Sequence, residues 1–310
     1  MSAPMVSVVV ETITLRESAH EGPLFDQLQP TLAAVAAQTL PCETIVVLNQ
    51  AVEPRLADEL RRRHPAVKLA WSEAPNYFAA KNAGARAAGG SIVALIDGDC
   101  VPEPDWLQKL LAPLAAADVV AGATKYTGRS LAARTFSVPD FGHVLADDGG
   151  AASGFNINNA AFRRELLLAH PLDARIRRNG GCYFLYHQLR AAGARVIYEP
   201  RAVVKHGLDV AGLGFIRKHF DRGYDGVSVY RLDDDAVLRG TRLFRRLGGM
   251  ALVPLTARRV VVDWVRLLRH RRQIGISLFT LPYFAFIAGL TRLIELAGGL
   301  TAAVAPRSSS

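Results

Sequence analysis

The sequence predicts an α/β fold, a mostly parallel sheet flanked by helices and followed by apolar helices at the C-terminus. Short apolar, β-branched runs such as 6–10 and 92–96 alternate with segments of helical pattern, which is typical of strand–helix–strand units. The 310 residues are 50% hydrophobic, so the chain can bury a sizeable core. Beyond residue 247 the composition changes to long apolar runs that contain many arginines.

Strands are expected where apolar residues run continuously, because strands of a parallel sheet are buried on both faces. In chain order these segments are 6–10, 44–48, 67–71, 92–96, 118–123 and 195–198. Helices are expected where apolar residues recur three or four positions apart or where alanine accumulates. In chain order these segments are 27–38, 54–63, 79–88, 105–117, 159–170 and 185–192. Residues 127–153 are rich in glycine, serine and aspartate, and we expect a long loop there.

The chain divides by composition into a domain over 1–247 and a hydrophobic, arginine-rich helical segment over 248–310. No charged residue occurs between Ile274 and Thr291, a length that borders on a membrane span, but Pro282 interrupts this run. Arginines beside an apolar helix favour the cytoplasmic face of an anionic membrane. Three interpretations stay open: an in-plane or re-entrant anchor, a true span, and a soluble helical cap or dimer interface.

The net charge of +9 and the pI near 9.8 suit an acidic ligand, a nucleic acid or an anionic membrane surface. Because no aromatic–basic alternation and no known nucleic-acid module occurs, we expect no nucleic-acid partner. The three cysteines are far apart and form no CxxC motif, so a reducing compartment is expected. The first residues show no pattern of a secretory signal.

Two carboxylates, Asp97 and Asp99, directly follow the predicted strand 92–96, and only Gly98 separates them. Ligands of open α/β sheets bind beyond the carboxyl ends of the strands. Mg²⁺ and Mn²⁺ take oxygen ligands, commonly one or two carboxylates together with phosphate oxygens of a substrate. The pattern therefore predicts a site for a metal–diphosphate. The alternative is an aspartate-rich turn that caps the following helix.

The stretch "APNYFAAKNAGARAAGGSIVALIDGDC" resembles the donor-binding segment of family 2 glycosyltransferases, which have the GT-A fold. "VSVVVET", "QTLPCETIVVLNQ", "GFNINNAAFRRELL" and "LRAAGARVIYEPRAVVKHG" are similar to other segments of that family, in the same order over about 6–225. The resemblance implies metal-dependent, inverting transfer of a sugar from a nucleotide-diphosphate sugar to a hydroxyl. It also implies a role in cell-envelope, glycolipid or polysaccharide synthesis at the cytoplasmic face of a membrane, with a lipid-linked or saccharide acceptor.

Two alternatives to this function stay open. The first is a non-catalytic protein of the same fold that binds a nucleotide sugar. The second is a sugar-phosphate nucleotidyltransferase, whose fold is similar. That class favours a glycine-rich, basic loop after the first strand, and "ETITLRESAHEGPLF" is not clearly such a loop.

The resemblance also implies roles for single residues. Asp97 would contact the nucleoside, Asp99 would hold the metal, and both would serve catalysis. Lys81, beside Asn82, would reach the diphosphate. The other expected contacts of the donor or the metal are Glu11 near the nucleobase, Asn49 at a base edge or ribose, His206 at the metal or diphosphate, and Arg222 at the diphosphate. Lys81, Glu11, His206 and Arg222 also have a structural interpretation, as solvated, structural or helix-face residues.

The sequence departs from the family where a Glu-Asp pair usually supplies the catalytic base. Counting back from Leu185 places Gly181 and Cys182 at those positions, and a thiol with an ordinary pKa of about 8.5 is a poor base for this task. Tyr183 and His187 lie nearby but read as core or helix-face residues. Another acid could serve, the acceptor could need little base help, or the protein could bind its donor without turnover. The candidate acids are Asp140, Asp147, Asp148 and Asp173.

Overall fold

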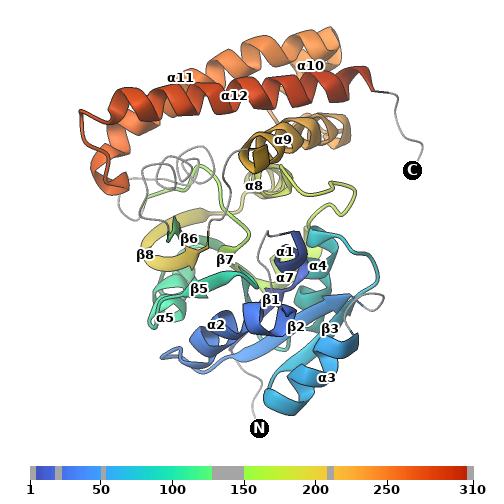
Figure 1. Cartoon of the computed structure of the whole chain (residues 1–310). Helices are drawn as coiled ribbons and strands as arrows, with labels where there is room; N and C mark the ends of the chain where they lie inside the picture. Colours follow the sequence, from blue (N-terminus) through green and yellow to red (C-terminus); the bar gives the residue numbers. More distant parts are fainter. Residues whose placement is uncertain (1–4, 18–22, 50–53, 128–149, 208–212, 306–310) are drawn as a thin grey trace.

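The computed structural model describes residues 5–17, 23–49, 54–127, 150–207 and 213–305, and the predicted α/β fold is confirmed in them (Figure 1). Their strands form one sheet in the order β3-β2-β1-β4-β7-β6-β8-β5. The strands are β1 (Val6–Glu11), β2 (Glu43–Asn49), β3 (Lys68–Ser72), β4 (Ile92–Asp97), β5 (Cys100–Pro102), β6 (Val119–Tyr126), β7 (Asn159–Arg163) and β8 (Val196–His206). Strands β3, β2, β1 and β4 are parallel, as are β6 and β8, while β7 and β5 run antiparallel to their neighbours.

Helices cover both faces of the sheet because successive side chains of its strands point to opposite sides. Val8 of β1 packs in the core with α2, α3 and α5, while Val9 packs in the core with α4, α7 and α8. The helices of the first part of the chain are α1 (Ile13–Glu17), α2 (Leu24–Ala36), α3 (Pro54–Arg63), α4 (Tyr77–Ala87), α5 (Trp106–Leu111), α7 (Arg164–Ala169) and α8 (Gly181–Ala191). The two apolar cores hold the carboxyl ends of β1 and β4 in place.

The prediction of a helix over 159–170 is wrong for its first five residues. Residues 159–163 form strand β7, which lies between β4 and β6, and only the following residues form helix α7. Asn159 is fully buried, accepts a hydrogen bond from the Trp106 indole at 2.8 Å, and donates one to the Ala202 carbonyl at 3.0 Å. Pairing with strands on both sides outweighs the helix propensity of the two alanines in this segment.

The strand expected over 195–198 is longer than predicted and continues to His206. Its register against β6 shifts between Gly122 and Ala123, where Glu199 and Val203 are the successive partners. Pro200 therefore lies in a bulge, a position that spares the sheet the hydrogen bond that proline cannot donate. The extended strand carries His206 to the neighbourhood of β5.

Long helices form the last part of the described chain and lie over α8 (Figure 1). They are α9 (Leu213–Leu232), α10 (Thr241–Leu247), α11 (Leu252–Ile274) and α12 (Leu281–Val304). The composition change near residue 248 coincides with the end of α10. Helix α12 packs along both α9 and α11, so helices from both sides of the predicted domain boundary form one helical layer. The division into two domains stays a prediction.

Candidate active site

Glu11 and Asp97 are neighbours across the parallel strands β1 and β4. Both are buried at the carboxyl ends of their strands. The turn that follows is fixed by Gly98, whose N–H donates to the Glu11 carbonyl at 2.9 Å. A Cβ atom at Gly98 would lie only 2.8 Å from that carbonyl oxygen. Glycine is therefore required here for the close backbone approach that brings Asp99 next to Asp97.

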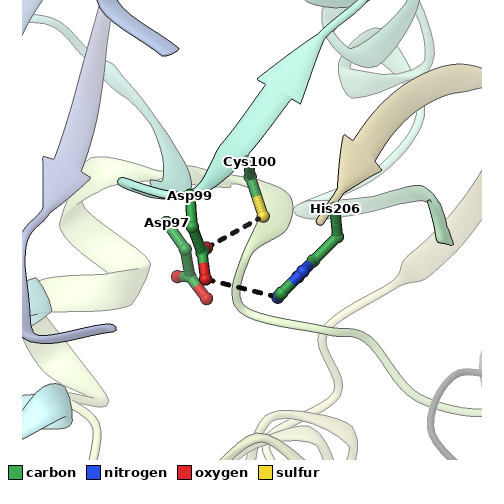
Figure 2. Close-up of side chains that lie close together, drawn as sticks. All are labelled: Asp97, Asp99, Cys100 and His206. Atoms are coloured by element: carbon green, nitrogen blue, oxygen red, sulfur yellow. Dashed lines mark hydrogen bonds and ion pairs between the residues drawn. The ribbon is translucent and has the colours of Figure 1, made fainter. Parts of the chain in front are cut away.

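Four side chains that could ligate a metal meet beside this turn: Asp97, Asp99, Cys100 and His206 (Figure 2). Their ligand atoms all lie within 4.8 Å of one another. His206 comes from the far end of β8, and the antiparallel pairing of β8 with β5 places it opposite Cys100. Sequence positions more than a hundred residues apart thus meet at one point.

A hydrogen bond to a backbone carbonyl orients the ring of His206 beside the carboxylates. Nδ1 lies 2.6 Å from the Gly207 carbonyl oxygen, which can only accept, so Nδ1 carries a proton and donates. Nε2 lies 3.7 Å from Oδ2 of Asp99. This arrangement, in which a carbonyl fixes the tautomer of a histidine, is typical of metal-binding imidazoles.

The chemistry of these groups fits a hard or borderline divalent cation. Burial, together with Asp99 and Asp97, raises the pKa of the Cys100 thiol well above its ordinary value. Cys100 therefore stays a neutral thiol, and Asn158 Nδ2 donates a hydrogen bond to its sulfur at 3.8 Å. The remaining donors are two carboxylates and one imidazole, a set that suits Mn²⁺ or Mg²⁺ better than a soft metal.

Asp97 is held by two side chains of helix α4. Nζ of Lys81 lies 2.6 Å from Oδ1, and the Tyr77 hydroxyl donates to the same oxygen at 2.8 Å. Burial raises the pKa of Asp97, but the nearby charges of Lys81 and Arg178 and these hydrogen bonds outweigh it, so the pKa is lowered. Asp97 is thus ionised and fixed in orientation. Lys81 is 0% exposed, so in this state its ammonium is engaged with Asp97.

Glu11 caps the short helix α1 that follows β1. Its carboxyl group accepts hydrogen bonds from the backbone of Ile13 at 2.7 Å and from the hydroxyl of Thr14 at 2.5 Å. Burial, followed by the charge of Asp97, raises the pKa of Glu11 to about 8. Glu11 is therefore protonated at neutral pH and holds the backbone beside the site.

The two asparagines that were predicted at the donor site both bond to the backbone of other segments. Asn49 is buried at the end of β2, and its Nδ2 donates to the Ser72 carbonyl of β3 at 3.1 Å. Asn82 forms a pair of hydrogen bonds with Leu172, donating to its carbonyl at 2.7 Å and accepting from its N–H at 3.0 Å. Asn82 thereby ties α4 to the segment that leads into α8.

A cation that the sequence analysis did not single out, Arg178, lies beside the acidic cluster. Its guanidinium stacks over the Tyr77 ring at 4.0 Å from the centroid, and its charge contributes to lowering the pKa of Asp97 and opposes the raised pKa of Asp99. Arg222, which was predicted at the diphosphate, lies on α9. The positive charge of Arg222 helps to lower the pKa of Glu295 on α12.

A cavity of about 680 Å³ opens beside Asp99. Its wall includes Leu15 and Thr31 on one side and Val101, Lys205 and Gly207 on the other. The hydroxyl of Thr31 donates to the Gly98 carbonyl at 2.7 Å, so helix α2 supports the turn between the two aspartates. This space next to the cluster is large enough for a small ligand, and Asp26 as well as Asp99 lines it.

Comparison with known proteins shows which family the central part of the chain resembles. The sequence model of Glycosyl transferase family 2 matches residues 20–167, a segment that contains Lys81, Asp97 and Asp99. Two glycosyltransferases of Haloferax volcanii are similar to the chain. Glycosyltransferase AglE is 28% identical over 132 residues, 40% of either protein. Glucosyl-dolichyl phosphate glucuronosyltransferase is 26% identical over 226 residues, 66% of this chain and 69% of that protein.

Residues 20–167, a little under half of the chain, therefore resemble a family 2 glycosyl transferase. The fold agrees: the crystal structure of GalNAc-T7 with UDP, GalNAc and Mn²⁺ superimposes on 79% of this chain and 51% of that chain, with a TM-score of 0.54 and 14% identity. At that identity the likeness is one of fold. The match with AglE covers 40% of this chain and 40% of that protein, so the activity of the whole chain is a proposal that rests on its own site.

Cys182, which the resemblance places where the family usually has its base, lies at the start of α8. Cys182 is half-buried, and burial raises the pKa of its thiol, with the negative charge of Asp97 contributing in the same direction. Gly181 is required because a Cβ there would lie 2.4 Å from the Phe78 ring. Cys182 is thus located beside the acidic cluster but stays protonated at neutral pH.

The other residues considered as bases give no better candidate within the described part of the chain. Asp173 is bound through both oxygens by Arg175, and its hydrogen bonds and ion pair outweigh burial and lower its pKa. The rings of Tyr183 and His187 pack edge to face at 4.5 Å. Asp140, Asp147 and Asp148 lie outside the described residues.

Proposed function

We propose that this chain transfers a sugar, with inversion, from a nucleotide-diphosphate sugar to an acceptor hydroxyl at a site that binds Mn²⁺ or Mg²⁺. The observation that carries the proposal is the meeting of Asp97, Asp99 and His206 at the carboxyl ends of β4 and β8. The match of residues 20–167 to the family 2 model and the adjoining cavity support it. The UDP, GalNAc and Mn²⁺ of the GalNAc-T7 structure are consistent with it.

Within this proposal Asp99 and His206 hold the cation, and Asp97 completes its environment and contacts the nucleoside. When bound, the cation neutralises the charge that develops on the departing diphosphate. The chain prepares this site in advance. Lys81 and Tyr77 fix the Asp97 carboxylate, and the protonated Glu11 adds no further negative charge beside it.

The donor is held, in this proposal, by groups from several segments. Asn49 and Glu11 lie at neighbouring strand ends, where a nucleoside would be bound. Arg178 supplies a positive charge for the diphosphate, since it lies over Tyr77 with its charge directed toward the cluster. Lys81 and Arg222 remain proposed diphosphate contacts, but Lys81 would have to exchange Asp97 for a phosphate oxygen. Asn82 positions the segment that carries Arg178.

A second function, binding of a nucleotide sugar without turnover, is favoured by one specific observation. The base position holds Cys182, whose thiol is protonated at neutral pH. The two functions differ in one measurable respect, because only the enzyme consumes the donor when the acceptor is present.

We also propose a lipid-linked or other envelope acceptor and a location at the cytoplasmic face of a membrane. The name of the Haloferax relative, a glucosyl-dolichyl phosphate glucuronosyltransferase, supports a lipid-linked acceptor. Helix α12 is long and apolar enough to cross a membrane, with a mean hydropathy of 1.4 over its best window. The arginines of α11 support the cytoplasmic face.

The test is a calorimetric titration of the full chain with a panel of nucleotide-diphosphate sugars, with and without Mn²⁺. We expect one donor to bind in a metal-dependent manner and to be consumed when lipid-phosphate or saccharide acceptors are added. Absence of binding by every donor would contradict the proposed function. Metal-dependent binding without consumption by any acceptor would favour the non-catalytic alternative.

A further inference from the structure

The outward face of helix α12 carries no charged residue. The helix contains two charged residues, Arg292 and Glu295, and both are directed inward. Its outward positions recur at helical spacing and include Phe286 and Leu293, which are 67% and 60% exposed. At a rise of about 1.5 Å per residue, this stripe extends along a helix of roughly 36 Å.

The exposed apolar stripe continues onto α11 and onto the turn that joins the two helices. Phe279 in the turn is 98% exposed, and Val261, Trp264 and Leu268 of α11 are about half exposed. Figure 1 shows α11 and α12 side by side as the outermost layer of the molecule. We call these residues, with Phe286 and Leu293, the outer apolar surface. Soluble monomers rarely expose an apolar surface that is continuous over two long helices.

The charge around the outer apolar surface has a single sign. Residues 241–304 contain ten arginines and two acids, Asp263 and Glu295. Both acids are buried and bound to Arg292. The exposed arginines of α11 include Arg258, Arg269 and Arg272. Among residues 241–304, the exposed charged side chains are therefore all cationic, and we call the exposed arginines of α11 the arginine rim.

Buried charges lock α12 to its neighbours. Arg292 Nε lies 2.7 Å from Asp263 of α11 and its Nη1 lies 2.5 Å from Glu295, while Glu295 Oε1 lies 3.2 Å from Nδ1 of His219 on α9. The backbones of α9 and α12 also touch, since a Cβ at Gly223 would lie 1.8 Å from the Glu295 carbonyl oxygen. A helix that crossed a bilayer alone would have to break these contacts and place two charges in hydrocarbon.

We propose that α11 and α12 lie in the plane of an anionic membrane surface, with the outer apolar surface at the acyl boundary and the arginine rim at the lipid headgroups. This refines the membrane attachment proposed above and is independent of the transfer chemistry. Amphipathic helices of this kind bind through buried apolar area together with attraction to anionic lipids. Helix α12 stays packed on α9 and does not cross the bilayer.

A second copy of the chain fits the same surface less well. A two-fold interface places the same patch on both partners, so the arginine rim of one copy would face the arginine rim of the other. Like charges opposed across an interface are unfavourable. An anionic lipid surface instead neutralises the whole rim.

The first experiment measures flotation of the full-length protein with vesicles of phosphatidylcholine containing about one third phosphatidylglycerol. We expect binding that falls at least about tenfold in the double variant Phe286→Asp with Leu293→Asp. The matched control is Leu168→Asp on α7, an exposed leucine outside the helical layer. The pair Arg269→Glu with Arg272→Glu should weaken binding to the anionic vesicles, whereas Arg61→Glu with Arg62→Glu on α3 should not.

The second experiment separates an in-plane from a spanning helix. Leu278, in the turn just before α12, and Val304, its last residue, are 61% and 85% exposed, and each is replaced by cysteine. In sealed membrane vesicles from the producing cells, a membrane-impermeant maleimide should label both positions from the same side, above the background of the parent chain. Labelling of the two positions from opposite sides would overturn the proposal.

Two further outcomes would also overturn it. In the first, the full-length protein does not bind the anionic vesicles but forms a dimer, and the double variant is monomeric. The outer apolar surface would then be a protein interface. The second is equal vesicle binding by the double variant and the parent. In each case donor titration is unaffected, so failure here is distinguishable from failure of the proposed transfer activity.

Discussion

Lys81 and Asp97 form an ion pair from which water is excluded, with Nζ 2.6 Å from Oδ1 and side-chain exposures of 0% and 5%. Helix α4 supplies the lysine and β4 the aspartate, so the ion pair also holds the helix against the strand. Removing one partner of such a pair commonly costs about 3–5 kcal/mol, because the other charge stays buried and uncompensated. The ion pair therefore fixes the carboxylate of Asp97 in place. The carboxylate of Asp99 instead faces the ring of His206.

Asp99→Asn should remove metal-dependent nucleotide binding while the protein stays folded. The neutral amide is a weak ligand, and the expected loss of affinity in the presence of Mn²⁺ is at least about tenfold. Asp105→Asn is the matched control, since Asp105 is exposed and pairs with Lys109 on the following helix. Calorimetry with and without Mn²⁺ measures the effect, and an unchanged metal-dependent affinity would remove Asp99 from the metal site.

Arg178→Ala should weaken binding of a nucleoside diphosphate by about tenfold or more, because hydrogen bonds from a guanidinium to phosphate are charge-assisted. Binding of the matching nucleoside should change much less. Arg175→Ala serves as the control, since Arg175 is in the same segment but exposed and bound to Asp173. Equal losses for the diphosphate and the nucleoside would indicate that Arg178 only supports the fold.

Cys182→Ala should leave turnover within a few-fold of the parent once the acceptor is found, because the thiol is protonated and packs as a small apolar group. Cys182→Asp should increase turnover with simple hydroxyl acceptors by supplying a base beside Asp97. Steady-state kinetics with saturating donor measures both. A loss near 10³-fold in Cys182→Ala, with donor affinity intact, would show that the thiol takes part in the chemistry.

Glu11 predicts a pH dependence of stability. Its pKa is about 8 in the fold and near 4.5 in the unfolded chain, so between these values the folded state binds a proton that the unfolded state lacks. The free energy of unfolding should therefore fall as pH rises from about 4.5 to about 8, with a slope of at most about 1.4 kcal/mol per pH unit from this group.

Glu11→Gln keeps an acceptor for the backbone N–H of Ile13 and cannot ionise, so this decline should disappear in the variant. Urea denaturation at several pH values compares the two proteins. If parent and variant show the same decline, Glu11 does not carry the proton and the charge balance at the site has to be reassigned.

Gly223→Ala should destabilise the protein by roughly 1–3 kcal/mol, because the added methyl group would lie against the Glu295 backbone and force α9 and α12 apart. Gly226→Ala, three residues later on the same helix, meets no described atom within 4 Å and should be neutral or stabilising by up to about 1 kcal/mol. Denaturant unfolding gives both values. Similar effects of the two substitutions would contradict the close helix crossing.

The parallel part of the fold could be predicted from the sequence because its signals are local. The apolar runs that became β1, β2 and β4 are continuous and bounded by polar residues, and Asp97 and Asp99 follow one of them directly. Parallel strand ends meet at one edge, so the acidic cluster could be located before the sheet order was known. His206 was placed there by resemblance, and the pairing of β5 with β8 brings it to the aspartates.

The remaining features depend on long-range contacts that leave no local pattern. Strand β7 reads as a helix because two alanines favour one, and its sheet pairing becomes visible only with β4 and β6 in place. Asn82 reads as a ligand contact, yet its amide is matched to the backbone of Leu172, ninety residues away. No sequence pattern marks Arg178 as a site residue, because its stacking on Tyr77 depends on how the segment before α8 folds back.

The interlocked helices α9 and α12 also bear on how the protein can be prepared. A chain shortened to end at Leu247 would remove Glu295 and uncover His219 and Val227, which are 0% and 1% exposed in the full chain. Such a fragment would expose to solvent the apolar face of α9 that α12 covers in the full chain. It is expected to precipitate or to require detergent. A water-soluble preparation for titration and crystallisation is better sought by replacing outward residues such as Phe279 and Phe286 with polar ones, which leaves the packing beneath them intact.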